Sequence, residues 1–322
     1  MTLPDIRTRR PLGRTGLRVG PLCIGTAPLG DMPDAYGVSA PEAQALATLR
    51  AVFASPIGFI DTSNNYGDGR AERRIGAVLR EIGGLGDWVL ATKADRNMTT
   101  GDFSGERMKR SVEESLERLG LDRLQFAYIH DPEHTTFEHI TSRGGALEVM
   151  QDLQRQDVIG DIGISGGPVD MLIRYVETGA FAAVETHNRY TLLNRSAGPL
   201  LDVCAARGVA VVNAAPYGSG MLAKGPDAFA RYAYQAAPTA LLDRARRLAT
   251  VCTEHGVPLA AAALQFSMRD PRVASTVVGM TKPERVEQTV SLATHPIPAD
   301  VWPALEAVGF DMDDPEANRW TT

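Results

Sequence analysis

The sequence DTSNNYG at residues 61–67 follows a short apolar run and carries several groups that can move protons. Two further apolar runs lead directly into Lys93 and His130. Asp61, Lys93 and His130 therefore stand at the ends of three apolar runs, with Tyr66 five residues after the first. A carboxylate, a lysine, an imidazole and a phenol at successive strand ends can converge at one mouth of a barrel.

Short apolar runs typical of buried strands recur along the chain, and most precede a segment with helical spacing. The runs lie at residues 20–26, 58–61, 88–92, 124–129, 161–165, 182–186, 209–215 and 273–279. The clearest helical spacing predicts helices at 70–81, 104–120 and 143–157, with Gly120 as a C-cap. Such strand–helix units over about 260 residues match a closed (β/α)8 barrel in size and number.

A doubly wound open sheet is the rival fold, but its GxGxxG fingerprint is absent from the sequence. Residues 67–72 and 218–223 each lack the third glycine. We therefore predict an α/β protein made of one (β/α)8 barrel domain over residues 1–322. The stretch 223–238 has no clear period and follows the seventh run, so we expect a loop over the barrel mouth.

Composition narrows the class of protein. The net charge of −6 over 322 residues argues against a general nucleic-acid binder. The first fourteen residues lack a signal-peptide core, and no run of about 18 apolar residues predicts a membrane span. Three widely spaced cysteines cannot form a fully paired disulfide framework and suit a reducing compartment. We expect a cytoplasmic monomer or small homo-oligomer whose partner is a small molecule.

The four groups at the strand ends form a coherent chemical set, although each taken alone is more often structural. A free phenol has a pKa near 10, which is too high for easy proton exchange at neutral pH. An ammonium such as Lys93 stabilises phenolate, and a carboxylate such as Asp61 keeps that lysine protonated. An imidazole such as His130 can orient the reacting oxygen or relay a proton. With Tyr66, the set is suited to exchanging a proton with an oxygen.

The run FIDTSNNYG at 59–67, followed by Glu72 and by Ile75-Gly76, resembles the signature of the aldo-keto reductases. The resemblance extends over roughly residues 11–292 and includes TK at 92–93, IH at 129–130, GIS at 163–165 and PYGSGML at 216–222. It implies a (β/α)8 barrel and a nicotinamide cofactor bound without a Rossmann domain and without a metal. It also implies that Tyr66 exchanges the proton.

The same resemblance implies that Lys93 and Asp61 tune the pKa of Tyr66 and that His130 orients the substrate. Near the nicotinamide, Ser165 is implied to bind the carboxamide. The family usually follows that serine with asparagine, where this chain has Gly166, and His187 or Asn188 could compensate.

Two further cofactor contacts are carried over from the family. Tyr190, in RYTLL at 189–193, is implied to stack on the nicotinamide ring. Backbone amides of the glycine-rich turn are implied to hold the pyrophosphate. The residues of this turn are Tyr217, Gly218, Ser219, Gly220, Met221 and Leu222.

The adenosine end departs from the family pattern. Where many members hold the 2′-phosphate with a lysine, a serine and an arginine, this chain has Gly279, Met280 and Arg285. Loss of a cation and a hydroxyl favours NAD over NADP, although Lys282 leaves use of both open. The expected contacts there are Gly279, Thr281, Arg285, Gln288 and Thr289, of which the last two replace residues often used around the adenine.

Residues 66–74 and 189–193 resemble the branch of NAD(P)-linked aldose 1-dehydrogenases and pyridoxal 4-dehydrogenases. This implies oxidation of an aldose, such as L-fucose or a D-threo-aldose, to the lactone, and a role in carbohydrate metabolism. A pyridoxal dehydrogenase, a general aldehyde or ketone reductase and a cofactor-sensing barrel without turnover are alternatives. A metal-dependent hydrolase is less favoured, because Pro132 interrupts the segment that carries His130 and His134.

Overall fold

The computed structural model describes residues 5–33, 37 and 39–317. Within these residues, parallel strands close into a barrel in the order β12-β3-β4-β5-β6-β7-β8-β9. The strands are β3 (Leu22–Gly25), β4 (Phe59–Asp61), β5 (Val89–Ala94), β6 (Leu124–His130), β7 (Ile159–Gly166), β8 (Ala183–His187), β9 (Ala210–Ala214) and β12 (Val273–Gly279). Each coincides with one of the eight apolar runs, so the predicted (β/α)8 barrel is confirmed.

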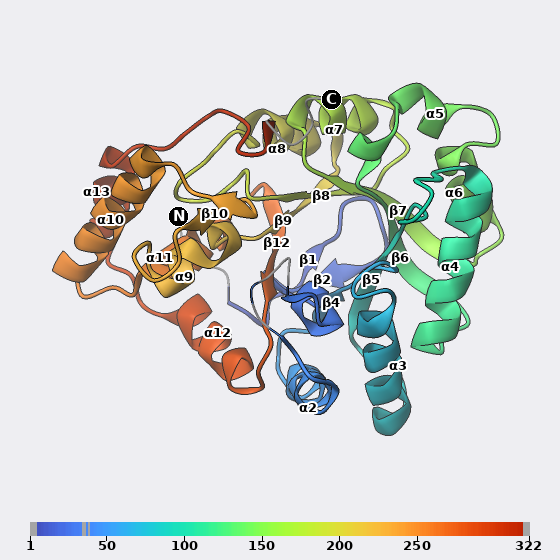
Figure 1. Ribbon diagram of the computed structural model, residues 1–322, viewed down its shortest axis with the longest axis horizontal. Coiled ribbons are helices and arrows are strands. Elements are labelled where there is room, and N and C mark those ends of the chain that lie inside the picture. The colour runs from blue at the N-terminus through green and yellow to red at the C-terminus, as the bar shows by residue number, and fades with distance from the viewer. Residues whose placement is uncertain (1–4, 34–36, 38, 318–322) are drawn as a thin grey trace.

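Helices surround the barrel on its outside (Figure 1). Those following the strands are α2 (Glu42–Phe53), α3 (Arg70–Ile82), α4 (Gly105–Leu119), α6 (Ala146–Arg155), α7 (Val169–Glu177), α8 (Gly198–Arg207), α11 (Leu259–Met268) and α12 (Glu284–Thr294). Shorter or additional helices are α5 (Phe137–Thr141), α9 (Met221–Lys224), α10 (Thr239–Glu254) and α13 (Val301–Ala307). Helices α10 and α13 pack side by side at one flank of the molecule (Figure 1).

Helix α4 shows how local sequence sets the element boundaries. Ser104 is the N-cap and its hydroxyl accepts the backbone N–H of Arg107 at 3.2 Å. Gly120 ends the helix with a φ of 70°, a conformation that costs glycine little. The apolar side chains of this helix, including Met108 and Val112, are buried against the barrel.

The interior of the barrel is apolar at the N-terminal ends of the strands. A hairpin of β1 (Arg10–Pro11) and β2 (Arg18–Val19) covers this end. Leu12 and Val19 belong to the same buried cluster as Phe59 and Val89 of the strands. The polar strand ends therefore lie at the opposite end of the barrel, which is where (β/α)8 enzymes place their active sites.

The stretch 223–238 contains more structure than the expected loop. It holds a short hairpin of β10 (Arg231–Tyr232) and β11 (Gln235–Ala236). The hydroxyl of Tyr232 donates to the backbone oxygen of Asn188 at 2.7 Å, just past β8. The hairpin therefore lies at the C-terminal end of β8, over the mouth.

The three cysteines are all free and buried. No helix in the described part of the chain combines the length and the apolar character needed to cross a membrane.

Candidate active site

Three neighbouring strands bring the predicted catalytic residues to one end of the barrel. Asp61 ends β4, Lys93 is the penultimate residue of β5, and His130 ends β6. Parallel pairing aligns Asp61 with the β5 residue Ala91, two before Lys93. Lys93 in turn pairs with Tyr128, two before His130. Because side chains two apart share a face of a strand, all three catalytic groups project from the same side of the sheet.

Lys93 is fully buried and is held by two carboxylates. Its ammonium donates to Asp61 Oδ1 and, at 3.0 Å, to the backbone oxygen of Thr62. Glu185 Oε1 of β8 lies 3.4 Å from Lys93 Nζ. Burial alone would lower the pKa of Lys93, but Asp61 and Glu185 raise it above its usual value. The ammonium therefore stays charged inside the barrel.

Glu185 is a functional candidate that sequence reasoning missed. It is the one charged residue in the apolar run 182–186, and that interruption was its only sequence signal. Burial, and then Glu185, raise the pKa of Asp61 well above its ordinary value despite the opposing effect of Lys93. Two carboxylates thus share one buried cation.

Tyr66 lies in the loop after β4, next to this cluster. The ammonium of Lys93 is 5.1 Å from the centroid of the Tyr66 ring. The ring of His130 stands nearly perpendicular to it, at 84° and 6.0 Å between centroids. The phenol, the ammonium and the imidazole are thus neighbours at the mouth of the barrel.

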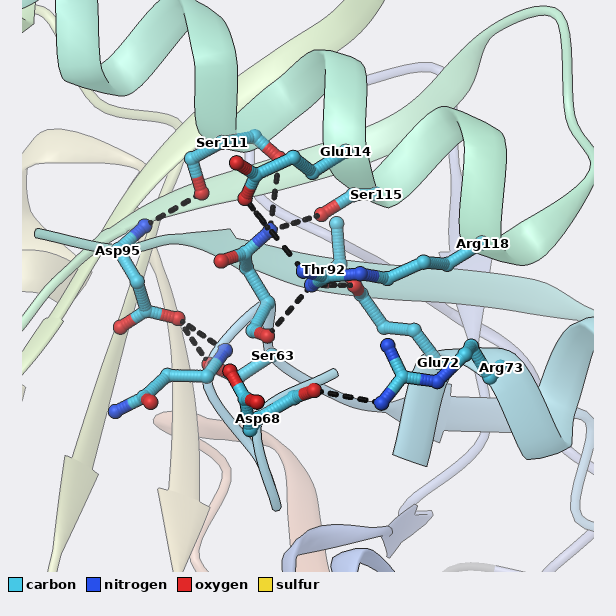
Figure 2. A network of polar contacts seen from close by, with 12 residues as sticks. Ser63, Asp68, Glu72, Arg73, Thr92, Asp95, Ser111, Glu114, Ser115 and Arg118 are labelled. Carbon is cyan, nitrogen blue, oxygen red and sulfur yellow. Dashed lines mark hydrogen bonds and ion pairs between the residues drawn. The ribbon is translucent and has the colours of Figure 1, made fainter. Parts of the chain in front are cut away.

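His130 is held by two carboxylates, one directly after β5 and one directly after its own strand β6. Its Nδ1 is 2.6 Å from Asp95 Oδ1. Asp95 also accepts the hydroxyl of Ser63 (Figure 2). Its Nε2 is 3.5 Å from Asp131 Oδ1. Burial alone would lower the pKa of His130, but Asp131 and Asp95 raise it to about 9. The imidazole is therefore protonated at neutral pH and can donate a hydrogen bond from Nε2.

A second polar network holds the loop that carries Tyr66 (Figure 2). Arg118 of α4 donates to the backbone oxygen of Asn64 at 2.9 Å and lies 3.2 Å from Glu72 Oε2. The hydroxyl of Thr92 donates to Glu72 Oε1 at 2.7 Å. These bonds tie α3, β5 and α4 to the loop, and so they set the position of Tyr66.

The predicted nicotinamide-binding residues lie at the ends of β7 and β8. Ser165 is buried near the end of β7, and the backbone N–H of Asp131 donates to its carbonyl at 2.8 Å. Asn188 follows β8 and is fully buried, and its amide oxygen and nitrogen have no hydrogen-bond partner within the described chain. Because buried amides are nearly always paired, Asn188 suits a polar ligand.

Tyr190 lies in the segment that follows β8, where its side chain packs against α11. Its hydroxyl donates to Asp270 Oδ2 at 2.5 Å and accepts from Arg272 at 3.0 Å. Its ring packs against Phe266 of α11 at 5.2 Å between centroids. This placement does not favour the stacking role that the family resemblance implies for Tyr190.

The glycine-rich turn after β9 has an unusual backbone. Ala215, Gly218, Ser219 and Gly220 all have positive φ angles. A Cβ at Gly218 would come within 2.2 Å of the ring of Tyr232, so only glycine fits there. Turns of this kind can direct backbone N–H groups at an anion.

The side chains of the turn differ in their surroundings. Met221 and Leu222 are buried in the core, and their backbone N–H groups donate to the carbonyls of Gly218 and Tyr217. Tyr217 is half-buried, and burial raises the pKa of its phenol.

The adenosine-end residues lie where β12 leads into α12. Met280 is buried, so its side chain belongs to the core, and Gly279 next to it is exposed. Arg285 donates to Gln288 at 2.5 Å. Of the other two predicted contacts, Thr281 is half-buried and Thr289 is buried.

The C-terminal segment completes the mouth beside β8, which the sequence did not indicate. Glu316 is fully buried and its Oε2 lies 3.1 Å from His187 Nε2 and 2.8 Å from Arg189 Nη1. Arg189 also lies 2.6 Å from Asp314. Burial alone would raise the pKa of Glu316, but His187 and Arg189 lower it to about 2.

Substitution Glu316→Gln should therefore destabilise the protein by about 3 kcal/mol at pH 7, because it leaves the buried Arg189 undercompensated. The carboxylate's contribution is present above the ordinary glutamate pKa and is lost as pH falls towards about 2. The difference in unfolding free energy between wild type and variant should shrink accordingly when urea denaturation is repeated at pH 3.5. An equal difference in unfolding free energy at pH 7 and pH 3.5 would show that the ionised Glu316 carboxylate does not stabilise the fold.

The histidines of the less favoured metal-dependent hydrolase alternative lie on separate elements. His139 lies on α5, apart from His130 at the end of β6. Across residues 5–33, 37 and 39–317, no three His, Cys, Asp or Glu side chains are placed to hold a metal ion.

Comparison with known proteins agrees with this geometry. The model of the Aldo/keto reductase family matches residues 21–309. The chain is 32% identical over 316 residues to D-threo-aldose 1-dehydrogenase of a Pseudomonas species, covering 90% of this chain and 94% of that protein. It is 31% identical to pyridoxal 4-dehydrogenase of Microbacterium luteolum over 341 residues, covering 94% and 97%. L-Galactose dehydrogenase of Arabidopsis thaliana is 31% identical over 309 residues, covering 94% and 91%.

Among solved structures, an aldo-keto reductase from Bacillus halodurans in its holo form superimposes with a TM-score of 0.79. It covers 97% of this chain and 99% of its own, at 22% identity, and so supports the fold. The strand-end residues, the closed barrel and the match over residues 21–309 lead to one conclusion. The chain belongs to the aldo/keto reductase family and is an NAD(P)-dependent oxidoreductase.

Proposed function

We propose that the protein oxidises an aldose at C1 to the lactone, with NAD as the preferred hydride acceptor. The observation that carries the proposal is the cluster of Tyr66, Lys93 and His130 in a chain whose relatives include an aldose dehydrogenase and a galactose dehydrogenase. The pyridoxal 4-dehydrogenase relative makes pyridoxal the second candidate substrate.

The mouth of the barrel suits a nicotinamide nucleotide. The unpartnered amide of Asn188 and the buried Ser165 offer polar contacts near the ends of β7 and β8. In the turn from Ala215 to Gly220, the N–H groups of Gly218 and Gly220 already donate within the turn, so its remaining N–H groups would hold a pyrophosphate. When bound there, the nicotinamide supplies the acceptor for the hydride from C1.

In this proposal, Tyr66 removes the proton of the anomeric hydroxyl as the C1–O bond becomes a carbonyl. The ammonium of Lys93 stabilises the negative charge that the phenolic oxygen carries before it takes the proton. Asp61 and Glu185 keep Lys93 charged for this role. The protonated His130 donates a hydrogen bond to the sugar oxygen and so holds C1 in position.

The preference for NAD follows from the adenosine end. Gly279 offers no side chain to a 2′-phosphate, and the side chain of Met280 is buried in the core. Arg285 already donates to Gln288, which leaves it a weaker clamp for a phosphate.

A spectrophotometric screen at 340 nm tests the proposal, pairing NAD and NADP with L-fucose, L-galactose, other L- and D-aldoses, and pyridoxal. We expect reduction of the nucleotide with at least one aldose, and a kcat/KM for NAD at least about tenfold above that for NADP. Turnover of pyridoxal alone would select the second candidate. Binding of a nucleotide without any turnover would instead point to a cofactor-sensing barrel.

A further inference from the structure

Glu133 is a half-buried residue in the mouth, and the proposed mechanism gives its carboxylate no role. It lies in the short helical turn Pro132–His134, directly after β6. Its Oε1 accepts the backbone N–H of Gly167, just past β7, at 2.9 Å. Its Oε2 is buried and has no hydrogen-bond partner among the residues the structure describes. A buried carboxylate oxygen without a donor is costly, so a ligand that donates to it would gain from the contact.

The carboxyl group of Glu133 lies directly over Gly166, the last residue of β7. A Cβ at Gly166 would come within 2.7 Å of Glu133 Oε2 and 3.1 Å of Pro132 Cδ. Gly166 follows Ser165, the residue proposed to meet the nicotinamide carboxamide. The side chain of Glu133 therefore occupies the space that a side chain at position 166 would need, beside the proposed carboxamide contact.

We propose that Glu133 Oε2 is part of the nicotinamide site and accepts an N–H of the carboxamide. The carboxamide has two N–H donors and one carbonyl oxygen, so Glu133 can take a donor while the hydroxyl of Ser165 serves the carbonyl. The inference rests on the proposed position of the nicotinamide near Ser165. A polar side chain at position 166 would otherwise make this hydrogen bond to the carboxamide. Gly166 has no side chain to do so, and we assign the hydrogen bond to Glu133.

The raised pKa of Glu133 is consistent with a carboxylate oxygen that lacks a hydrogen-bond donor. Burial, and then the neighbouring Asp131, raise the pKa of Glu133 to about 7. A hydrogen bond donated by a ligand favours the ionised form and so offsets part of this cost. The bond to Gly167 already fixes the orientation of the group, so Oε2 is preorganised for a ligand.

Substitution Glu133→Gln tests the inference, because it replaces the acceptor Oε2 with an amide nitrogen that donates. The glutamine oxygen is needed by the N–H of Gly167, which leaves the amide nitrogen where Oε2 stood, so a donor would face a donor. The probes are NAD and its 3-acetylpyridine analogue, in which a methyl ketone replaces the amide and no N–H is present. Isothermal titration gives the dissociation constant of each, and the phosphorylated pair is used if the wild type prefers NADP.

We expect the wild type to bind NAD more tightly than the analogue, and Glu133→Gln to weaken NAD binding by about tenfold. Binding of the analogue should change by less than about twofold, since it brings no N–H to this position. The control is Glu254→Gln, the same change at an exposed position of α10, which should alter neither constant. The inference would be overturned if the ratio of the dissociation constants for NAD and the analogue were the same in Glu133→Gln as in the wild type. Intact nucleotide binding with a raised KM for the sugar would also overturn it, because the carboxylate would then meet the substrate.

A second pair of variants separates ligand recognition from folding. Glu133→Ala opens the space over Gly166 and should abolish the preference for NAD over the analogue. Adding Gly166→Asn to that variant places a side-chain amide in the opened space and should restore the preference, whereas Gly166→Asn alone meets Glu133 and should not bind NAD well. No recovery in a folded double variant, judged by its circular dichroism, would count against the inference. Because these readouts are binding constants, they stay measurable even if no aldose is turned over and the proposed function fails.

Discussion

Replacing Tyr66 with phenylalanine should reduce kcat for the aldose by about 10³-fold or more, because the variant lacks the group that exchanges the proton. The ring itself remains, so its contacts with Lys93 and His130 should persist. The dissociation constant for NAD should therefore change by less than about twofold. Steady-state rates at 340 nm and fluorescence titration of the nucleotide measure the two quantities separately.

This pattern separates a chemical role from a structural one. Loss of the hydroxyl should lower kcat with little effect on nucleotide binding, whereas a misplaced loop at 63–68 would affect both. A variant that kept a kcat within about tenfold of wild type would show that another group carries the proton.

Replacing Lys93 with methionine should have the largest effect on stability, a loss of about 3–5 kcal/mol in the free energy of unfolding. Asp61 and Glu185 are only 2% and 5% exposed, and Lys93 is the cation that lies between them. Without it, two buried carboxyl groups face each other with no cation between them, and the pKa of Asp61, already raised by burial and by Glu185, loses the opposing effect of Lys93. Turnover should also be lost, because nothing then stabilises the phenolate of Tyr66.

The pH dependence of this loss follows from proton uptake. A buried carboxyl group with a raised pKa, such as Asp61, holds a proton that the unfolded chain releases, so the folded state loses stability as pH rises. Urea denaturation should therefore show a larger deficit for Lys93→Met at pH 8 than at pH 5.5. A deficit that is equal at both values would indicate lost packing rather than unpaired charge.

Variants that neutralise Asp61 and Glu185 are the matched controls for Lys93→Met. Adding Asp61→Asn and Glu185→Gln to Lys93→Met removes the unpaired charges and should recover much of the lost stability without restoring turnover. Glu185→Gln alone should leave Lys93 paired with Asp61 and cost far less. Failure of the triple variant to recover would contradict the electrostatic explanation.

The pattern of apolar residues along the chain was sufficient to predict the barrel and the convergence of the central site residues. Each strand was visible as a short apolar run, because both faces of a barrel strand are buried. The position of Lys93 and His130 at the ends of such runs predicted their convergence, since parallel strands bring their C-terminal ends to one mouth. The hairpin within 223–238 was not predicted, because its strands are only two residues long and have no measurable period.

The partners of the site residues could not be predicted, because they come from distant parts of the chain. Asp95 beside His130, Glu185 beside Lys93 and Glu316 beside His187 are each an ordinary acidic residue in the sequence. Only closure of the barrel shows which cation each one meets. Tyr190 is a further example, because its motif gave no sign that its ring packs against Phe266 of α11.

The sequence by itself determined the barrel and the family and supplied the candidate acid–base residues, because hydrophobic period and motif order are properties of neighbouring residues. Only the tertiary structure decided the charge state and orientation of those residues. Burial and the charges of groups that folding brings close set each pKa, and the burial does not exist until the barrel closes.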